Sequence, residues 1–243
     1  MRSISKCIIS LLLLAGSAQA QVDRWLPSGI RIGVEAGTPF FYIFSEKQNH
    51  WEVQADLDID KFLLVADYGR ATFQLNESTY SYTNEGGYLR LGLDYNFLAS
   101  DSAMQVIFFG LRYAQSSFSD RLDFNTRAVI ESETGWPPVW SSNTNGAAGA
   151  RWFELASGIK ARVFQNVFMG FTVRYKMLLK VRDTGTLRPY FVPGFGKFID
   201  ANTWGLNYYV YYRIPFRKKV FYKPKPKPDK STNPEQPAVE IRQ

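Results

Sequence analysis

The sequence predicts an all-β protein: an eight-stranded antiparallel transmembrane β-barrel followed by a disordered basic C-terminal tail. In residues 51–60 every odd position is apolar and every even one is an acid or an amide. Successive side chains of a strand point to opposite faces, so this segment has one apolar wall and one charged wall. Ten residues is also the length that a tilted strand needs to cross a bilayer. Residues 88–97 repeat the pattern.

The N-terminal segment has the composition of a secretory signal peptide. Arg2 and Lys6 precede an apolar run, and Ala18-Gln19-Ala20 is a small-x-small cleavage site. We therefore expect a signal peptide over residues 1–20, an outer-membrane β-barrel over 21–216 and a tail over 217–243. The only cysteine, Cys7, falls in the signal peptide, which excludes disulfides and cysteine chemistry from the mature chain.

Alternation and spacing predict eight strands joined by connections of alternating length. The expected strands lie near residues 29–41, 51–60, 62–70, 88–97, 104–116, 152–163, 167–179 and 204–216. Short turns near 60–61, 98–101 and 164–166 alternate with longer segments at 39–50, 71–87, 117–151 and 180–202. Outer-membrane barrels have short periplasmic turns and long surface loops, and an even strand count places both chain ends in the periplasm. Side chains fill an eight-stranded interior, so no conducting pore is expected.

The charges at inward positions divide between the two halves of the expected barrel. The first four strands point seven acids and two bases inward, and the last four point six bases and one acid. Unpaired ions in a narrow lumen are costly, which predicts a cross-lumen ion-pair network that seals the barrel. Its candidate members are Glu52, Asp56, Asp58, Asp67, Arg90, Asp94, Arg112, Lys160, Arg174, Lys176 and Arg213. The inward set also includes Arg31, Glu35, Asp60, Glu154 and Arg162. The alternative is a proton or ion path through the lumen.

Three strand segments carry a resemblance to a known group of proteins. Residues 151–155 (RWFEL), 158–160 (GIK) and 170–176 (GFTVRYK) resemble an uncharacterised family of eight-stranded outer-membrane β-barrel proteins of Bacteroidota. This resemblance implies a role in envelope biogenesis more readily than one in transport or catalysis.

The net charge of +7 is concentrated at the two ends of the chain. The signal peptide and the tail carry the excess, so the barrel is neutral and nucleic-acid binding by the folded body has no electrostatic support. In the tail, Lys223, Lys225 and Lys227 alternate with prolines, which favours an extended polyproline II arm. We expect this arm to bind an envelope protein partner. A solvated terminus and an anionic lipid or cell-wall polymer are the alternatives.

Two other features suggest sites on the surface loops. Trp136 and Trp140 flank a proline pair and form a candidate partner-docking element, with packing over the barrel mouth or on lipid headgroups as alternatives. His50 is the only histidine, which excludes a multi-histidine metal site. Ser45 and Glu46 lie near it, but a Ser-His-acid relay needs a geometry that the spacing does not impose, so we expect a solvated loop histidine.

The sequence therefore favours a non-enzymatic outer-membrane barrel without cofactor or metal. We expect contact with outer-membrane lipid and a role as an accessory or scaffold subunit of an envelope machine, such as the outer-membrane protein assembly complex. The alternatives are a lipid-modifying enzyme that uses His50 and a surface adhesin or receptor that uses the third loop.

Overall fold

A computed structural model describes residues 25–37, 48–101, 103–125, 140–182, 187–198 and 200–217. The predicted signal peptide, the tail beyond Arg217 with Lys223, Lys225 and Lys227, and the loop residue Trp136 lie outside the described residues. So do the Ser45 and Glu46 of the hypothetical relay.

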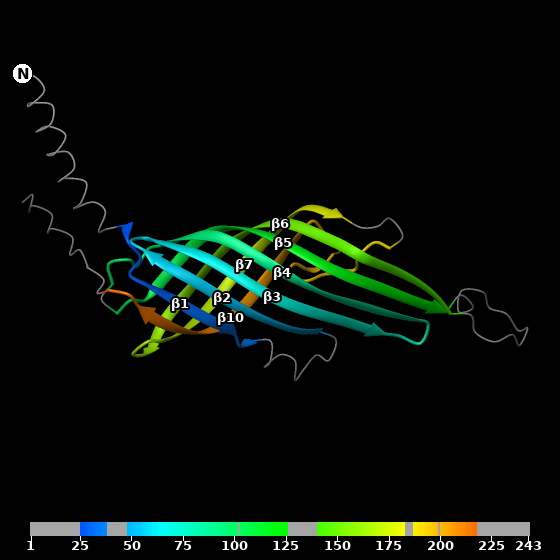
Figure 1. Ribbon diagram of the computed structural model, residues 1–243, viewed down its shortest axis with the longest axis horizontal. Coiled ribbons are helices and arrows are strands. Elements are labelled where there is room, and N and C mark those ends of the chain that lie inside the picture. Colours follow the sequence, from blue (N-terminus) through cyan, green and yellow to red (C-terminus); the bar gives the residue numbers. More distant parts are fainter. Residues whose placement is uncertain are drawn as a thin grey trace, which may run out of the picture.

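Eight strands close into a barrel in which each strand runs antiparallel to its neighbours (Figure 1). The strands are β1 (Gly29–Glu35), β2 (Gln48–Ile59), β3 (Phe62–Asn76), β4 (Tyr80–Asn96), β5 (Val106–Asn125), β6 (Trp140–Phe164), β7 (Val167–Arg182) and β10 (Asn202–Pro215). Around the ring the order is β1-β10-β7-β6-β5-β4-β3-β2. The predicted fold class, an all-β eight-stranded antiparallel barrel, is confirmed. Among the described residues, no helix combines the length and apolarity needed to cross a membrane.

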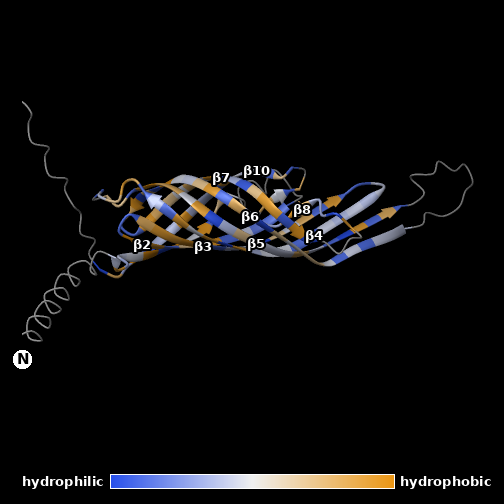
Figure 2. Cartoon of the chain, turned by 90° about the horizontal axis from the view of Figure 1, so that it is seen from above, coloured by the Kyte–Doolittle hydropathy of each residue, from blue (hydrophilic) through white to orange (hydrophobic). Residues whose placement is uncertain are grey.

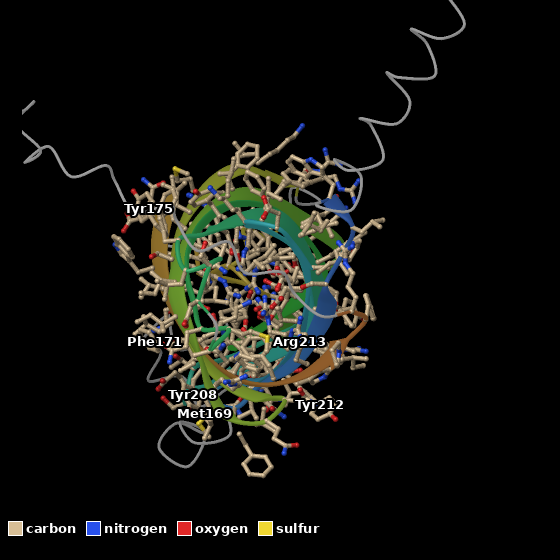
Figure 3. All side chains as sticks on the ribbon, turned by 90° about the vertical axis from the view of Figure 1, so that its left-hand side faces the viewer. Met169, Phe171, Tyr175, Tyr208, Tyr212 and Arg213 are labelled. Atoms are coloured by element: carbon tan, nitrogen blue, oxygen red, sulfur yellow. The ribbon has the colours of Figure 1, made fainter. Side chains whose placement is uncertain are left out.

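The barrel is apolar outside and polar inside. On β5, Phe109, Leu111 and Tyr113 are exposed, whereas Arg112, which lies between Leu111 and Tyr113, is buried. Figure 3 shows the same division from one end of the barrel, with Phe171 on the outer surface and Arg213 inside. The inversion of the usual soluble arrangement follows from the two-residue period of the strands, because one face of each strand is charged and the other is apolar.

The outward-facing apolar side chains, exposed or half-buried, form an apolar belt. On β2 the belt covers the odd positions from Trp51 to Ile59, and on β5 it ends at Tyr113, beyond which Gln115 and Ser117 face outward. The hydrophobic colour in Figure 2 is concentrated on this part of the strands. Nine residues at about 3.4 Å each span about 27 Å between the end residues, or about 21 Å in height at a tilt of about 40°.

The strands β3 to β6 continue well beyond the belt, which corrects two of the expected loops. Residues 71–87 and much of 117–151 were predicted as connections, but β3 runs to Asn76, β4 starts at Tyr80, β5 runs to Asn125 and β6 starts at Trp140. Their outward residues turn polar while the alternation of burial continues, so a search for an apolar outer face stops too early. We call this four-stranded extension the protruding wall (Figure 1).

A short segment between β7 and β10 folds back against the inner side of the protruding wall. Residues 187–198, here the plug loop, contain the hairpin of β8 (Phe191–Val192) and β9 (Gly196–Lys197). The ring of Phe191 stacks on Phe73 of β3 at 4.9 Å between centroids, and Phe195 packs edge-on against Trp152 of β6 at 5.7 Å. The loop therefore fills the barrel mouth at the end where the wall protrudes.

Gly194 at the turn of the plug loop has to be glycine for two reasons. Its φ of 79° lies in the left-handed region that L side chains rarely adopt. A Cβ atom there would also lie 2.5 Å from Cγ of the buried Tyr88 ring. The close approach of the loop backbone to β4 thus depends on the absence of a side chain on Gly194.

We predict that Gly33→Ala destabilises the barrel at the β1–β10 seam. The added Cβ would lie 2.2 Å from Cδ1 of Tyr211, whose ring is buried and whose hydroxyl donates to Gln54 at 2.5 Å. Overpacking of this kind costs about 1–3 kcal/mol. The midpoint of urea unfolding, read from heat-modifiable gel migration, should fall. Gly146→Ala is the matched control, because no atom lies within 4 Å of its Cβ position. Equal midpoints for the two variants would contradict the prediction.

Candidate functional site

Charged and hydrogen-bonding side chains from all eight barrel strands meet in the lumen. Figure 3 shows nitrogen and oxygen atoms gathered inside the ring. One contributor from each strand, in chain order, is Arg31, Glu52, Asp67, Arg90, Arg112, Glu154, Arg174 and Tyr209. Each of these side chains is buried.

Two arginines and two glutamates form the part of the network nearest the plug loop. Arg90 on β4 contacts Glu52 with Nη1 at 2.6 Å and Glu154 with Nε at 2.9 Å. Arg174 on β7 faces the same two carboxylates, at 3.3 Å from Glu52 and 3.4 Å from Glu154. Because each cation lies between two anions, removal of one of the four leaves the others with uncompensated charge.

Among the described carboxylates, Asp67 contacts the largest number of arginines. Its Oδ2 lies 2.9 Å from Arg112, 3.2 Å from Arg174 and 3.7 Å from Arg90. Arg112 uses its second amino group to contact Asp94 at 2.9 Å. The three arginines come from β4, β5 and β7, so a single carboxylate on β3 connects opposite parts of the ring.

A second group of ion pairs lies nearer the short-turn end of the barrel. Asp56 on β2 contacts Lys160 of β6 and Arg31 of β1, both at 2.6 Å. Asp58 lies 3.9 Å from Arg31. The Lys160–Asp56 pair crosses the lumen between strands that are not neighbours in the ring.

Some predicted network members have other partners. Lys176 donates to the backbone carbonyls of Gly194 and Phe195 at 2.8 and 3.0 Å, and Arg213 donates to Ser28 Oγ at 3.2 Å. The inward placement of Arg162 was wrong, because its side chain is exposed. The pairing register shifts between Arg162 and Phe164, so the alternation of β6 is lost at the short turn to β7. Asp60 lies in the β2–β3 turn with φ 52° and is only partly buried.

Charge compensation makes this interior tolerable. Eight carboxylate residues and seven Lys or Arg residues are buried among the described residues. A buried ion without a partner costs several kcal/mol, whereas opposite charges at these distances offset much of the desolvation penalty. The lumen of the described barrel is therefore occupied by a nearly neutral set of interlocking side chains.

The plug loop is tied to the lumen network through its backbone. Gly194 O accepts hydrogen bonds from Arg90 Nη2 at 3.0 Å and from Lys176 Nζ at 2.8 Å. The sequence reasoning missed this element and treated residues 180–202 as a plain surface connection. The apolar residues Phe191, Val192 and Phe195 in an otherwise loop-like segment are the signal that could have revealed it, since such residues need cover.

A separate polar cluster fixes the plug loop to the protruding wall. Tyr82 OH donates to Asp120 at 3.2 Å and accepts the backbone N–H of Tyr190 at 3.2 Å. Asn84 Nδ2 donates to the Phe191 carbonyl at 3.0 Å. Burial, with a further contribution from the Asp120 charge, raises the pKa of Tyr82 to about 12.

The predicted surface sites fall in different surroundings. Trp140 pairs with Asn125 at the tip of the protruding wall, and 54% of it is exposed. The expectation of a solvated loop histidine was wrong, because His50 lies within β2 with only 17% of its side chain exposed and Nε2 3.7 Å from Glu35 Oε2. Within the described residues, no group of three or more His, Cys, Asp or Glu side chains is placed to hold a metal.

Comparison with known proteins identifies a family. Residues 2–219 match the family described as a domain of unknown function, DUF6048. The chain belongs to this family. No curated protein matches the DUF6048 chain.

Two solved structures are similar to this DUF6048 barrel. The crystal structure of Neisserial surface protein A (NspA) is 15% identical in sequence, with a TM-score of 0.37, over 77% of this chain and 96% of that one. The N-terminal β-barrel domain of Pseudomonas aeruginosa OprF is 10% identical, with a TM-score of 0.34, over 78% of this chain and 100% of that one.

We predict that Arg112→Met strongly destabilises the barrel. The change leaves Asp67 and Asp94 without the cation that contacts both, and breaking a buried pair from one side costs about 3–5 kcal/mol. The urea midpoint of the heat-modifiable folded band should fall accordingly. Arg121→Met is the control, because Arg121 pairs with Asp123 at the surface. A midpoint for Arg112→Met equal to that of the control would contradict a compensating role for Arg112.

We predict that the anchoring of the plug loop by Tyr82 weakens in alkali. An unfolded tyrosine titrates near pH 10 and folded Tyr82 near pH 12. The folded pKa is raised, so the stability that neutral Tyr82 contributes is complete below about pH 10 and is lost as the pH rises through about 12. The tyrosinate absorbance of Tyr82→Phe, subtracted from that of the unchanged protein, should show one step near pH 12. A step near pH 10 would contradict this assignment.

Proposed function

We propose that this DUF6048 protein is a non-enzymatic outer-membrane β-barrel with a closed, salt-bridged lumen that acts as a scaffold, as an accessory subunit of an envelope machine. The observation that carries the proposal is the lumen network drawn from all eight strands and capped by the plug loop. With the interior occupied, the surfaces outside the belt are left to interact with partners. The resemblance to Bacteroidota barrel proteins points to one such machine, a complex that assembles outer-membrane proteins.

The apolar belt supports placement in an outer membrane. Its height of about 21 Å on β2 is close to the apolar band of about 25 Å that is typical of outer-membrane barrels. Above the belt the outward residues of β5 change to Gln115, Ser117 and Ser119, as water contact requires. The signal peptide predicted over residues 1–20 agrees with this location in the outer membrane. By the same rule the short turns face the periplasm and the protruding wall faces outward.

The protruding wall supplies the surface on which a scaffold needs to bind. Four paired strands form a stiffer platform than separate loops, because their backbone groups are already hydrogen-bonded. Trp140 stands exposed at the tip, and large exposed aromatics are common anchors of protein interfaces. Lys223, Lys225 and Lys227 of the tail offer a second, basic binding element on the periplasmic side.

A second candidate function is that of a surface adhesin or receptor. The same exposed Trp140 at the tip of the wall favours it, because the tip is the part of the described barrel farthest along β5 and β6 from the belt. The two candidates differ in whether the tail takes part in binding: the scaffold uses the tail as well as the wall, whereas the receptor uses the wall alone.

Conductance tests the closed lumen. Purified protein in planar bilayers should give no steady current, because the ion pairs around Asp67 and the plug loop occupy the path. The folded state is checked first by heat-modifiable migration. A large, steady, voltage-independent conductance would overturn the sealed-lumen part of the proposal.

Co-purification tests the scaffold role. The full chain, a truncation after Arg217 and Trp140→Ala are each extracted in mild detergent at two salt concentrations, and the retained proteins are identified by mass spectrometry. A stoichiometric envelope partner that is lost on truncation and weakened by salt supports the scaffold, because screening reduces contacts between exposed charges. Loss only in Trp140→Ala favours the receptor. Absence of any stoichiometric partner from the full chain would overturn the scaffold role.

A further inference from the structure

Three exposed cations gather on the outer surface of β6 and β7, immediately beyond the apolar belt. Arg151 on β6 pairs with Lys180 on β7, and Gly149 pairs with Arg182. All three charged side chains are exposed. The guanidinium of Arg182 lies over Gly149, 3.9 Å from the position of a Cβ there. We call Arg151, Lys180 and Arg182 the cationic patch.

A break in the strand register brings the patch together. The pairing of β6 with β7 shifts between Arg151 and Trp152, so that Trp152 faces Leu178 and Arg151 faces Lys180. Leu179 is the extra residue on β7, and both it and Lys180 are exposed. Regular alternation after Leu179 would have turned Lys180 toward the lumen, so the bulge directs this lysine to the outer surface beside Arg151.

The patch is not neutralised in the way that other exposed cations of the wall are. Arg70 pairs with Glu85 across β3 and β4, and Arg121 pairs with Asp123 at 2.9 Å. Within the described parts of the chain, no ion pair involves Arg151, Lys180 or Arg182.

The neighbours of the patch leave it with a net positive charge. On the neighbouring strand β5, the residue paired with Arg151 is the neutral Gln115. The exposed Asp200 precedes β10, which pairs with β7 from Met177 onward. Among the described residues, the three positive charges of the patch are therefore opposed by the single negative charge of Asp200 near the start of β10.

Apolar side chains lie directly below the patch. Phe153 precedes the lumen residue Glu154 on β6 and is 36% exposed, and Leu179 on β7 is 54% exposed. Beside them Trp204 packs on Tyr175 at 4.9 Å between ring centroids, with 69% of Trp204 exposed. Cations above and an aromatic and aliphatic surface below match a molecule with phosphate groups at its head and hydrocarbon chains beneath.

We propose that the cationic patch and the apolar surface below it bind a phosphorylated lipid headgroup of the outer leaflet. This inference rests on the outer-membrane orientation given under the proposed function. Arg151, Lys180 and Arg182 pair with the headgroup phosphates, and the acyl chains lie along Phe153 and Leu179. The site is on the outside of the barrel, so it is separate from the lumen network.

The test measures binding of bisphosphorylated lipid A to the folded full-length protein in mixed detergent micelles. Near an anionic surface each Lys or Arg contributes about 1 kcal/mol, or about a fivefold change in affinity. Arg151→Gln, Lys180→Gln and Arg182→Gln should therefore each weaken binding by about fivefold, and the triple variant by roughly a hundredfold. Arg121→Gln is the matched control and should bind as the unchanged protein does. Heat-modifiable migration verifies folding, and the single variants decide the matter if the triple variant does not fold.

Probes that differ in phosphate separate the possible ligands. Dephosphorylated lipid A should bind the unchanged protein as weakly as bisphosphorylated lipid A binds the triple variant. Unchanged binding by the three single variants, or an equal loss in Arg121→Gln, would overturn the site. Full competition by inorganic phosphate would assign a free anion and overturn the lipid assignment. Failure of the barrel to insert into bilayers would instead contradict the proposed membrane placement. Native mass spectrometry of detergent-extracted protein detects bound lipid, so lipid binding is read separately from membrane insertion.

Discussion

Compensation of buried charge is the constraint on which the rest of this structure depends. A ring of eight strands has a narrow interior, and within the belt the outer face carries apolar side chains, so the polar side chains of this part of the strands point inward. Asp67 illustrates the result: one carboxylate on β3 is surrounded by the guanidinium groups of Arg90, Arg112 and Arg174. The ion pairs help to fix the register of the strands that carry them, because a shift by one residue would turn the inward charges of a strand to its apolar face.

The network also has consequences for how the barrel forms. The hydrogen bond from Arg174 to Glu52 joins residues 122 apart in the sequence, and that from Lys160 to Asp56 joins residues 104 apart. Such pairs exist only when the ring closes, so a partly assembled sheet exposes unpaired ions on one face and apolar residues on the other. This couples closure of the ring, neutralisation of the lumen and docking of the plug loop through Arg90 into one cooperative event.

The fold followed from the sequence because a two-residue period fixes which side chains point inward. Residues 51–60 revealed β2 without any tertiary information, and the opposite charge of the two halves anticipated that cations of β5 to β7 would face acids of β2 to β4. The protruding wall was not anticipated, because its outward residues, such as Ser117 and Ser119, are as polar as those of a loop. The plug loop and the partner choice of Lys176 depend on Gly194 approaching Tyr88, a contact between segments about 100 residues apart that periodicity does not encode.

In the membrane orientation proposed above, the length of the protruding wall sets how far the barrel reaches beyond the lipid surface. Between Tyr113, the last belt residue of β5, and Asn125, twelve residue steps of about 3.4 Å give about 41 Å of strand. With the belt in a bilayer, the wall lifts its tip and the exposed Trp140 clear of the lipid surface. In that orientation the tip is the part of the described barrel farthest from the lipid surface, and substitutions confined to it would leave the charged interior undisturbed.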